Sequence, residues 1–129
     1  MTNQIIVIVN GDPVFRDVVS HALTEAGYES VLHDGGAGVA TTIAHEQPCA
    51  VVVNADDAPP TEEIVLALVE HDSHAEHIPV VVCGQHTQLR QDVVKSLQPR
   101  RGAVLASSLA PDELLAKLKE LEQSQGSER

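Results

Sequence analysis

Three uninterrupted apolar runs, at residues 5–9, 49–53 and 79–83, constrain the fold of this chain most. They read IIVIV, CAVVV and PVVVC, so apolar and polar residues do not alternate along them. Strands with one solvated face show such alternation, whereas strands covered on both faces read as continuous runs rich in Val and Ile. The runs therefore predict the strands of a sheet that is buried on both sides.

Stretches with helical spacing separate these strands. Helices are expected at residues 12–26, 38–46, 61–70, 88–97 and 111–121, and two weaker strands at residues 30–32 and 103–105. In the first helix, Asp12 is a suitable N-cap, Pro13 suits the first helical position and Gly27 suits the end. Strand and helix alternate five times, which predicts a three-layer α/β domain around a parallel sheet. We expect six valines at the centre of this sheet: Val7, Val9, Val51, Val53, Val80 and Val82.

Composition limits the class of protein further. The 129 residues suit one domain, expected at 1–122, with a polar tail or linker start at 123–129. Lys and Arg number 8 against 19 Asp and Glu, so the net charge is 8 − 19 = −11, which argues against direct nucleic-acid binding. The two cysteines suggest a reducing compartment, and neither a membrane-spanning run nor an export signal is visible. We therefore expect a cytoplasmic protein.

Short motifs at the starts of the expected elements carry a family resemblance. They are Asp12-Pro13 with Arg16, Gly27-Tyr28, Gln47-Pro48, Ile78-Pro79 and Ala110-Pro111. In this order and at this spacing, residues 4–121 resemble the receiver domains of bacterial two-component response regulators. The resemblance implies a flavodoxin-like (βα)5 fold with strand order 2-1-3-4-5.

The resemblance also implies where a phosphorylation site would lie. Receiver domains accept a phosphoryl group on an aspartate after the third strand, beside an acidic pair that holds Mg²⁺, a hydroxyl and a lysine. Here the acceptor position falls on Asn54, the acidic pair on Asn10 and Gly11 with Asp12 following, the hydroxyl on Gly84, and the lysine on Ser107, or on Ala106 if that loop is one residue shorter. The aromatic switch of the fifth strand falls on Val104.

These replacements remove the chemistry of phosphoryl transfer. An amide is a poor nucleophile and cannot form an acyl phosphate. Only Asp12 remains to hold a cation, and no lysine remains to balance developing charge. We therefore expect a pseudo-receiver that signals through protein contacts, with no enzyme activity, no cofactor and no metal ion.

Two alternative functions remain open at this stage. Asp56 or Asp57 could be the phosphoryl acceptor of an atypical receiver, although a solvated acidic loop before Pro59 explains both residues. The emptied pocket could also bind another small ligand at the carboxyl ends of the strands, where parallel sheets of this class bind ligands.

Other motifs have simpler explanations than a functional site. His71, His74 and His77 could supply zinc or nickel ligands, but their segment is expected to be a solvated connection. Cys83 is expected to be a small buried residue and not a redox group. The glycines of residues 35–38 are expected to form a helix-entry turn and not a phosphate-binding loop.

Cationic residues cluster in the last third of the chain. Six of the eight lie between positions 90 and 119: Arg90, Lys95, Arg100, Arg101, Lys117 and Lys119. In an acidic protein this asymmetry predicts a docking patch for an acidic protein partner, such as a regulator or a kinase. Homodimerisation through the fourth helix, fifth strand and fifth helix would use the same patch. The alternative is that these side chains only solubilise two amphipathic helices.

Overall fold

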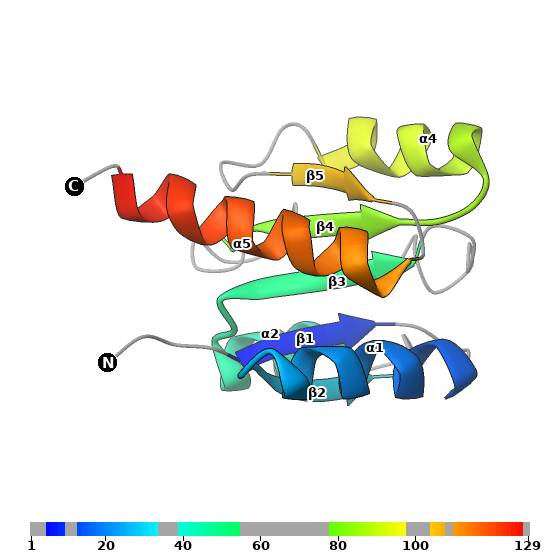
Figure 1. Cartoon of the computed structure of the whole chain (residues 1–129). Helices are drawn as coiled ribbons and strands as arrows, with labels where there is room; N and C mark the ends of the chain where they lie inside the picture. Colours follow the sequence, from blue (N-terminus) through cyan, green and yellow to red (C-terminus); the bar gives the residue numbers. More distant parts are fainter. Residues whose placement is uncertain are drawn as a thin grey trace.

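The computed structural model describes residues 5–9, 13–33, 39–54, 78–97, 104–107 and 110–127 (Figure 1). The described strands are β1 (Ile5–Val9), β2 (Glu29–His33), β3 (Ala50–Asn54), β4 (Val80–Cys83) and β5 (Val104–Ser107). The described helices are α1 (Pro13–Glu25), α2 (Val39–Glu46), α4 (Thr87–Leu97) and α5 (Pro111–Ser127). The helix expected at residues 61–70 lies outside the described residues.

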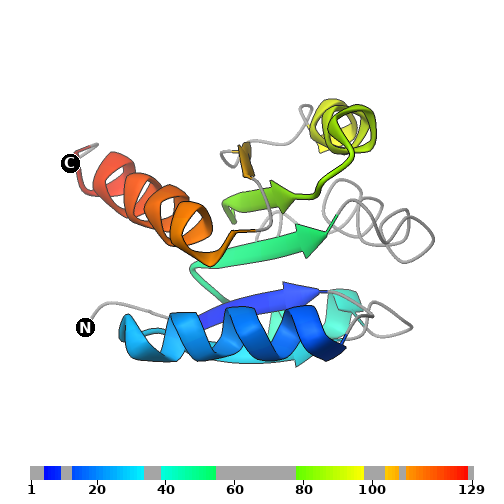
Figure 2. The same ribbon diagram turned by 45° about the vertical axis from the view of Figure 1, so that its right-hand side comes forward.

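The five strands form one sheet in the order β2-β1-β3-β4-β5. All four neighbouring pairs are parallel, which confirms the predicted flavodoxin-like architecture. Helices α1 and α5 cover one face of the sheet, and α2 and α4 lie on the other (Figures 1 and 2). The carboxyl ends of all strands therefore meet at one edge of the sheet.

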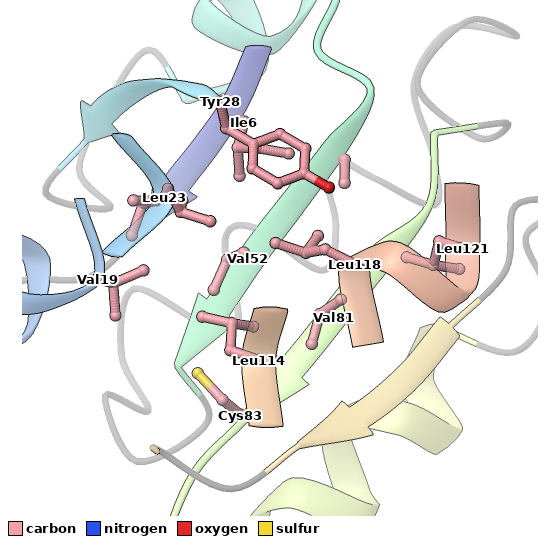
Figure 3. Close-up of a cluster of buried hydrophobic side chains, with 12 residues drawn as sticks. Ile6, Val19, Leu23, Tyr28, Val52, Val81, Cys83, Leu114, Leu118 and Leu121 are labelled. Carbon is pink, nitrogen blue, oxygen red and sulfur yellow. The ribbon is translucent and has the colours of Figure 1, made fainter. Parts of the chain in front are cut away.

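Two hydrophobic clusters lie on the two faces of the sheet. Successive side chains of a strand point to opposite faces, so Val7 and Val9 pack with Ile43 of α2 and Leu97 of α4. The alternate residues of β1, Ile6 and Ile8, belong to the second cluster, which also contains leucines of α1 and α5 (Figure 3). All six valines predicted for the centre are at most 1% exposed, as expected: Val7, Val9, Val51, Val53, Val80 and Val82. The apolar runs are thus continuous because both faces are buried.

The end of α1 shows how the sequence sets a helix boundary. Gly27 has φ 94°, a conformation that favours glycine. Its N–H donates to the Thr24 carbonyl at 3.1 Å, and the Tyr28 N–H donates to the Leu23 carbonyl at 2.9 Å. This is the Schellman arrangement, and it places Tyr28 in the same buried cluster as Leu23 (Figure 3).

We expect Gly27→Ala to lower the free energy of unfolding by about 1 kcal/mol, because a side chain in the left-handed region costs roughly 1–2 kcal/mol and the less flexible unfolded chain offsets part of this. Space is not the cause, since no other atom lies within 4 Å of an added Cβ. Urea denaturation measures the change. Gly27→Asn is the control and should lose less, because asparagine tolerates positive φ. Equal stability of Gly27→Ala and the wild type would contradict the assignment of Gly27 as a left-handed residue that ends α1.

Several element boundaries differ from the expectation. β2 extends over Glu29–His33, one residue further at each end than predicted, and β5 covers Val104–Ser107 because it pairs with β4 from Val80 to Cys83. α5 continues to Ser127, into the segment expected to be a polar tail. Glu and Gln are good helix formers, so polarity alone did not end this helix. In the described part of the chain, no helix has the length and apolar character needed to cross a membrane.

Candidate functional site

Three small polar side chains lie in one row at the carboxyl edge of the sheet. Asn54 ends β3, Cys83 ends β4 and Ser107 ends β5. The strand register pairs Asn54 with Cys83 and Cys83 with Ser107, so Cys83 lies between the other two residues across the sheet. Their exposed fractions are 7%, 0% and 2%. The row is therefore a buried, uncharged end to the three strands.

The row lies on the sheet face that α1 and α5 cover. Cys83 belongs to the second hydrophobic cluster together with Leu114 (Figure 3). Asn54 follows Val52 of that cluster by two residues, and Ser107 follows Leu105, which packs against it, so the strand pleat places all three on the same face.

The Cys83 thiol donates a hydrogen bond to the Val53 carbonyl at 3.4 Å, inside the fold. The thiol is completely buried, which confirms the prediction of a small buried residue. Redox-active cysteines are partly exposed, so this thiol lacks the access that a redox role needs. The other cysteine, Cys49, is half-buried, and neither cysteine forms a disulfide bond.

Gly84 follows Cys83 in the chain and is hydrogen-bonded by a residue of α4. It is buried, and its carbonyl accepts a hydrogen bond from Nη1 of Arg90 at 2.8 Å. The resemblance places the hydroxyl of a receiver at this position, and glycine supplies none. Gly84 therefore contributes only backbone groups to the carboxyl edge.

The remaining predicted site residues divide into two groups. Ala106 is exposed, whereas Ser107 is buried and in register with Cys83, and Val104 is half-buried against the first cluster. The residues outside the described ranges are Asn10, Gly11, Asp12, Asp56, Asp57, His71, His74 and His77. The described structure thus brings together Asn54, Gly84 and Ser107 from the predicted pocket.

The described part of this edge carries no charged group that could perform phosphoryl transfer. The last residues of the five strands are Val9, His33, Asn54, Cys83 and Ser107. None is a carboxylate or a lysine, and the described residues contain no group of three His, Cys, Asp or Glu that could hold a metal ion. The edge offers an amide, a thiol, a hydroxyl and, at the end of β2, the His33 imidazole. These groups can donate or accept hydrogen bonds, but none of them forms an acyl phosphate.

Four of the six cationic residues of the predicted patch lie in described helices, Arg90 and Lys95 in α4 and Lys117 and Lys119 in α5, and these helices lie on either side of β5 (Figure 1). Arg90 is half-buried and Lys95 is exposed. The Lys117 side chain is 33% exposed, and its Nζ lies 3.9 Å from Glu120, which is a weak surface pair. Lys119 is about 200° further around the helix, at roughly 100° per residue, so the two lysines do not share a face.

Two other members of the predicted patch, Arg100 and Arg101, lie outside the described residues. The described patch therefore consists of Arg90, Lys95 and Lys117. Half-buried Val94 lies in α4, with Arg90 and Lys95, and half-buried Val104 lies in β5, between the two helices in the chain.

Comparison with known proteins shows the fold. In sequence, the chain matches no protein-family model and no characterised protein. In structure, it is similar to a response-regulator signal receiver domain from Bermanella marisrubri, with 11% identity, TM-score 0.74 and coverage of 93% of this chain and 98% of the other. The chemotaxis response regulator CheY4 of Vibrio cholerae gives 21% identity, TM-score 0.72 and coverage of 93% and 99%. A CheY-like receiver domain protein from Methanospirillum hungatei gives 20% identity, TM-score 0.73 and coverage of 99% of this chain and 100% of the other. The chain has the receiver fold over its length.

Proposed function

We propose that this chain is a receiver-like signalling module that acts through protein contacts and without phosphorylation. The chain shares the fold of receiver domains. The positions to which the family resemblance assigns the reaction carry Asn54, Gly84 and Ser107 in this sequence, which supports the proposal. The proposed partner is a protein, such as a regulator or a kinase, that docks on the face made by α4, β5 and α5.

Asn54 is the observation that carries this proposal. It ends the central strand β3 and is 7% exposed at the carboxyl edge, and the family resemblance implies that the acceptor carboxylate of a receiver would lie at this position. An amide nitrogen and oxygen can bind hydrogen-bonding groups there, but an amide does not attack phosphorus to give an acyl phosphate. Beyond it along the same edge lie Cys83 at the end of β4, Gly84 directly after it and Ser107 at the end of β5, and none of them supplies a cation for the phosphoryl oxygens.

We expect the protein to be inert toward phosphoryl donors. Incubation with Mg²⁺ and acetyl phosphate should leave the intact mass unchanged, and Mg²⁺ with beryllofluoride should leave the melting temperature unchanged. A protein that binds a ligand at 100 times its Kd gains about 2.7 kcal/mol of stability, which shifts melting by several degrees in a domain of this size. A mass gain of one phosphoryl group, or a shift of that size, would contradict the proposal.

The double variant Asp56→Asn with Asp57→Asn is the matched control. If the wild type gained a phosphoryl group and this variant did not, the alternative of an atypical receiver with its acceptor at these positions would be correct. Asn54→Asp restores the carboxylate alone and should also show no mass gain, because the other polar groups are still missing. The same melting assay with nucleotides tests the small-ligand alternative, and we expect no shift.

The docking face is proposed from its charge and its half-buried apolar residues. Arg90, Lys95 and Lys117 flank β5 in a protein of net charge −11, so carboxylates of a partner would be attracted to this face. Val94 and Val104 lie in α4 and β5 and would supply apolar contact. Such an arrangement sets orientation and association rate more than affinity.

A further inference from the structure

Arg90 connects the exposed side of α4 with the carboxyl edge of the sheet. It is the fourth residue of α4, which begins at Thr87, and its Nη1 reaches back to the Gly84 carbonyl at 2.8 Å. Its own backbone N–H donates to the His86 carbonyl at 3.0 Å. Side chain and backbone of this residue therefore bind two carbonyls of residues 84–86. These residues form the segment that joins β4 to α4 (Figure 1).

The position of this cation is unfavourable without its contact. The amino end of a helix carries a partial positive charge, so an arginine near it is repelled, and the first turn of α4 contains no acidic residue to offset this. A hydrogen bond from a charged donor is stronger than one between neutral groups. The bond to Gly84 therefore explains how an arginine is accommodated at this place.

Gly84 is adjacent to the buried polar row. It follows Cys83, which is in register with both Asn54 and Ser107. Glycine has no side chain that could contact neighbouring residues, so the side-chain hydrogen bond to its carbonyl comes from Arg90 of α4. The Gly84 carbonyl therefore lies one residue beyond the strand end that is placed between Asn54 and Ser107.

We propose that Arg90 is a releasable clamp, which a carboxylate of a docking partner exchanges for the Gly84 carbonyl. This inference rests on the proposed docking face, because the carboxylate must approach α4. A carboxylate is a stronger acceptor for a guanidinium than a neutral carbonyl and can take two of its N–H groups. Docking on α4 is thereby coupled to the segment 84–86 at the carboxyl edge, and a ligand that moved this segment would change the affinity for the partner by the same factor.

The clamp is tested by amide hydrogen exchange in Arg90→Met, which keeps the apolar stem, with Lys95→Met as the control on the same helix. Loss of the clamp should speed exchange of the position-90 amide about tenfold, and Lys95→Met should leave it unchanged. A purely electrostatic role of Arg90 predicts the opposite sign, since removing a cation near a helix amino end stabilises the helix. Unchanged or slower exchange in Arg90→Met would overturn the clamp.

Release is tested by titrating the wild type with a hexaglutamate peptide at low salt and following amide resonances. We expect the resonance of the Gln85 amide, which follows the Gly84 carbonyl, to shift toward its position in the spectrum of Arg90→Met. The same shift should occur in Lys95→Met once that variant is saturated with the peptide. Shifts on α4 and α5 that leave Gln85 unmoved would overturn release while supporting the docking face. If the peptide shifted no resonance, both the release of Arg90 and the docking face would be wrong. Phosphorylation of the chain in the acetyl phosphate experiment would contradict only the proposed independence from phosphorylation.

Discussion

Leu23→Ala should lower the free energy of unfolding by about 2–5 kcal/mol, because truncating a buried leucine removes apolar contact and leaves a cavity. Leu23 is 0% exposed and packs with Ile6, Ile8 and Tyr28 in the cluster beneath α1 and α5. A domain of this kind is stable by roughly 5–15 kcal/mol, so the single change removes a large share of the total. Urea denaturation followed by circular dichroism measures the loss.

Two further variants make this prediction specific. Leu32→Ala, at a leucine that is 41% exposed on β2, should cost less than about 1 kcal/mol. Leu97→Ala should cost about as much as Leu23→Ala, and the two losses should add to within roughly 0.5 kcal/mol, because the sheet separates their clusters. Equal costs for Leu23→Ala and Leu32→Ala would show that the two-cluster description of the core is wrong.

Neutralising Lys95 and Lys117 should weaken binding of hexaglutamate about tenfold at low salt, since each exposed charge pair contributes roughly 0.2–1 kcal/mol. The variant Lys95→Gln with Lys117→Gln changes the net charge from −11 to −13. Thr24→Glu with Thr41→Glu makes the same change of −2 at exposed positions of α1 and α2, and should alter the affinity by less than about twofold.

Isothermal titration at two salt concentrations measures both affinities. The difference between the variants should shrink at 0.15 M salt, where the screening length is about 8 Å. If the two double variants lose the same affinity, net charge alone governs binding and the face made by α4, β5 and α5 is not the docking surface.

Much of the fold could be predicted because its causes are local in the sequence. Continuous runs such as residues 5–9 reveal a strand that is covered on both faces, and Gly27 reveals a helix end that needs positive φ. By contrast, Gln47 has φ 48° just after α2, although no glycine stands at this position to indicate a left-handed conformation. That conformation depends on how the chain enters β3, where Pro48 is buried and Cys49 donates to the Ile5 carbonyl at 2.8 Å.

The candidate site could be predicted less completely, because it depends on contacts between distant segments. The resemblance assigned the hydroxyl position to Gly84 but did not give the strand register, which places Cys83 directly opposite Asn54 and Gly84 one residue beyond. Arg90 was expected only as one cation of a surface patch. Its bond to the Gly84 carbonyl depends on where α4 starts relative to the end of β4, and no spacing rule contains that information.

The strand order also decides when, during synthesis, the apolar surface of the sheet becomes covered. β1, β2 and β3 are neighbours and all come from residues 5–54, so they can pair while the ribosome is still making the rest of the chain. β4 and β5 then add one after the other at the same side. The cluster under α1 and α5 is completed only by Leu114, Leu118 and Leu121, close to the end of the sequence. A nascent chain from which α5 has not yet emerged therefore presents an open apolar sheet face, and exposed apolar surface of this kind favours aggregation until α5 covers it.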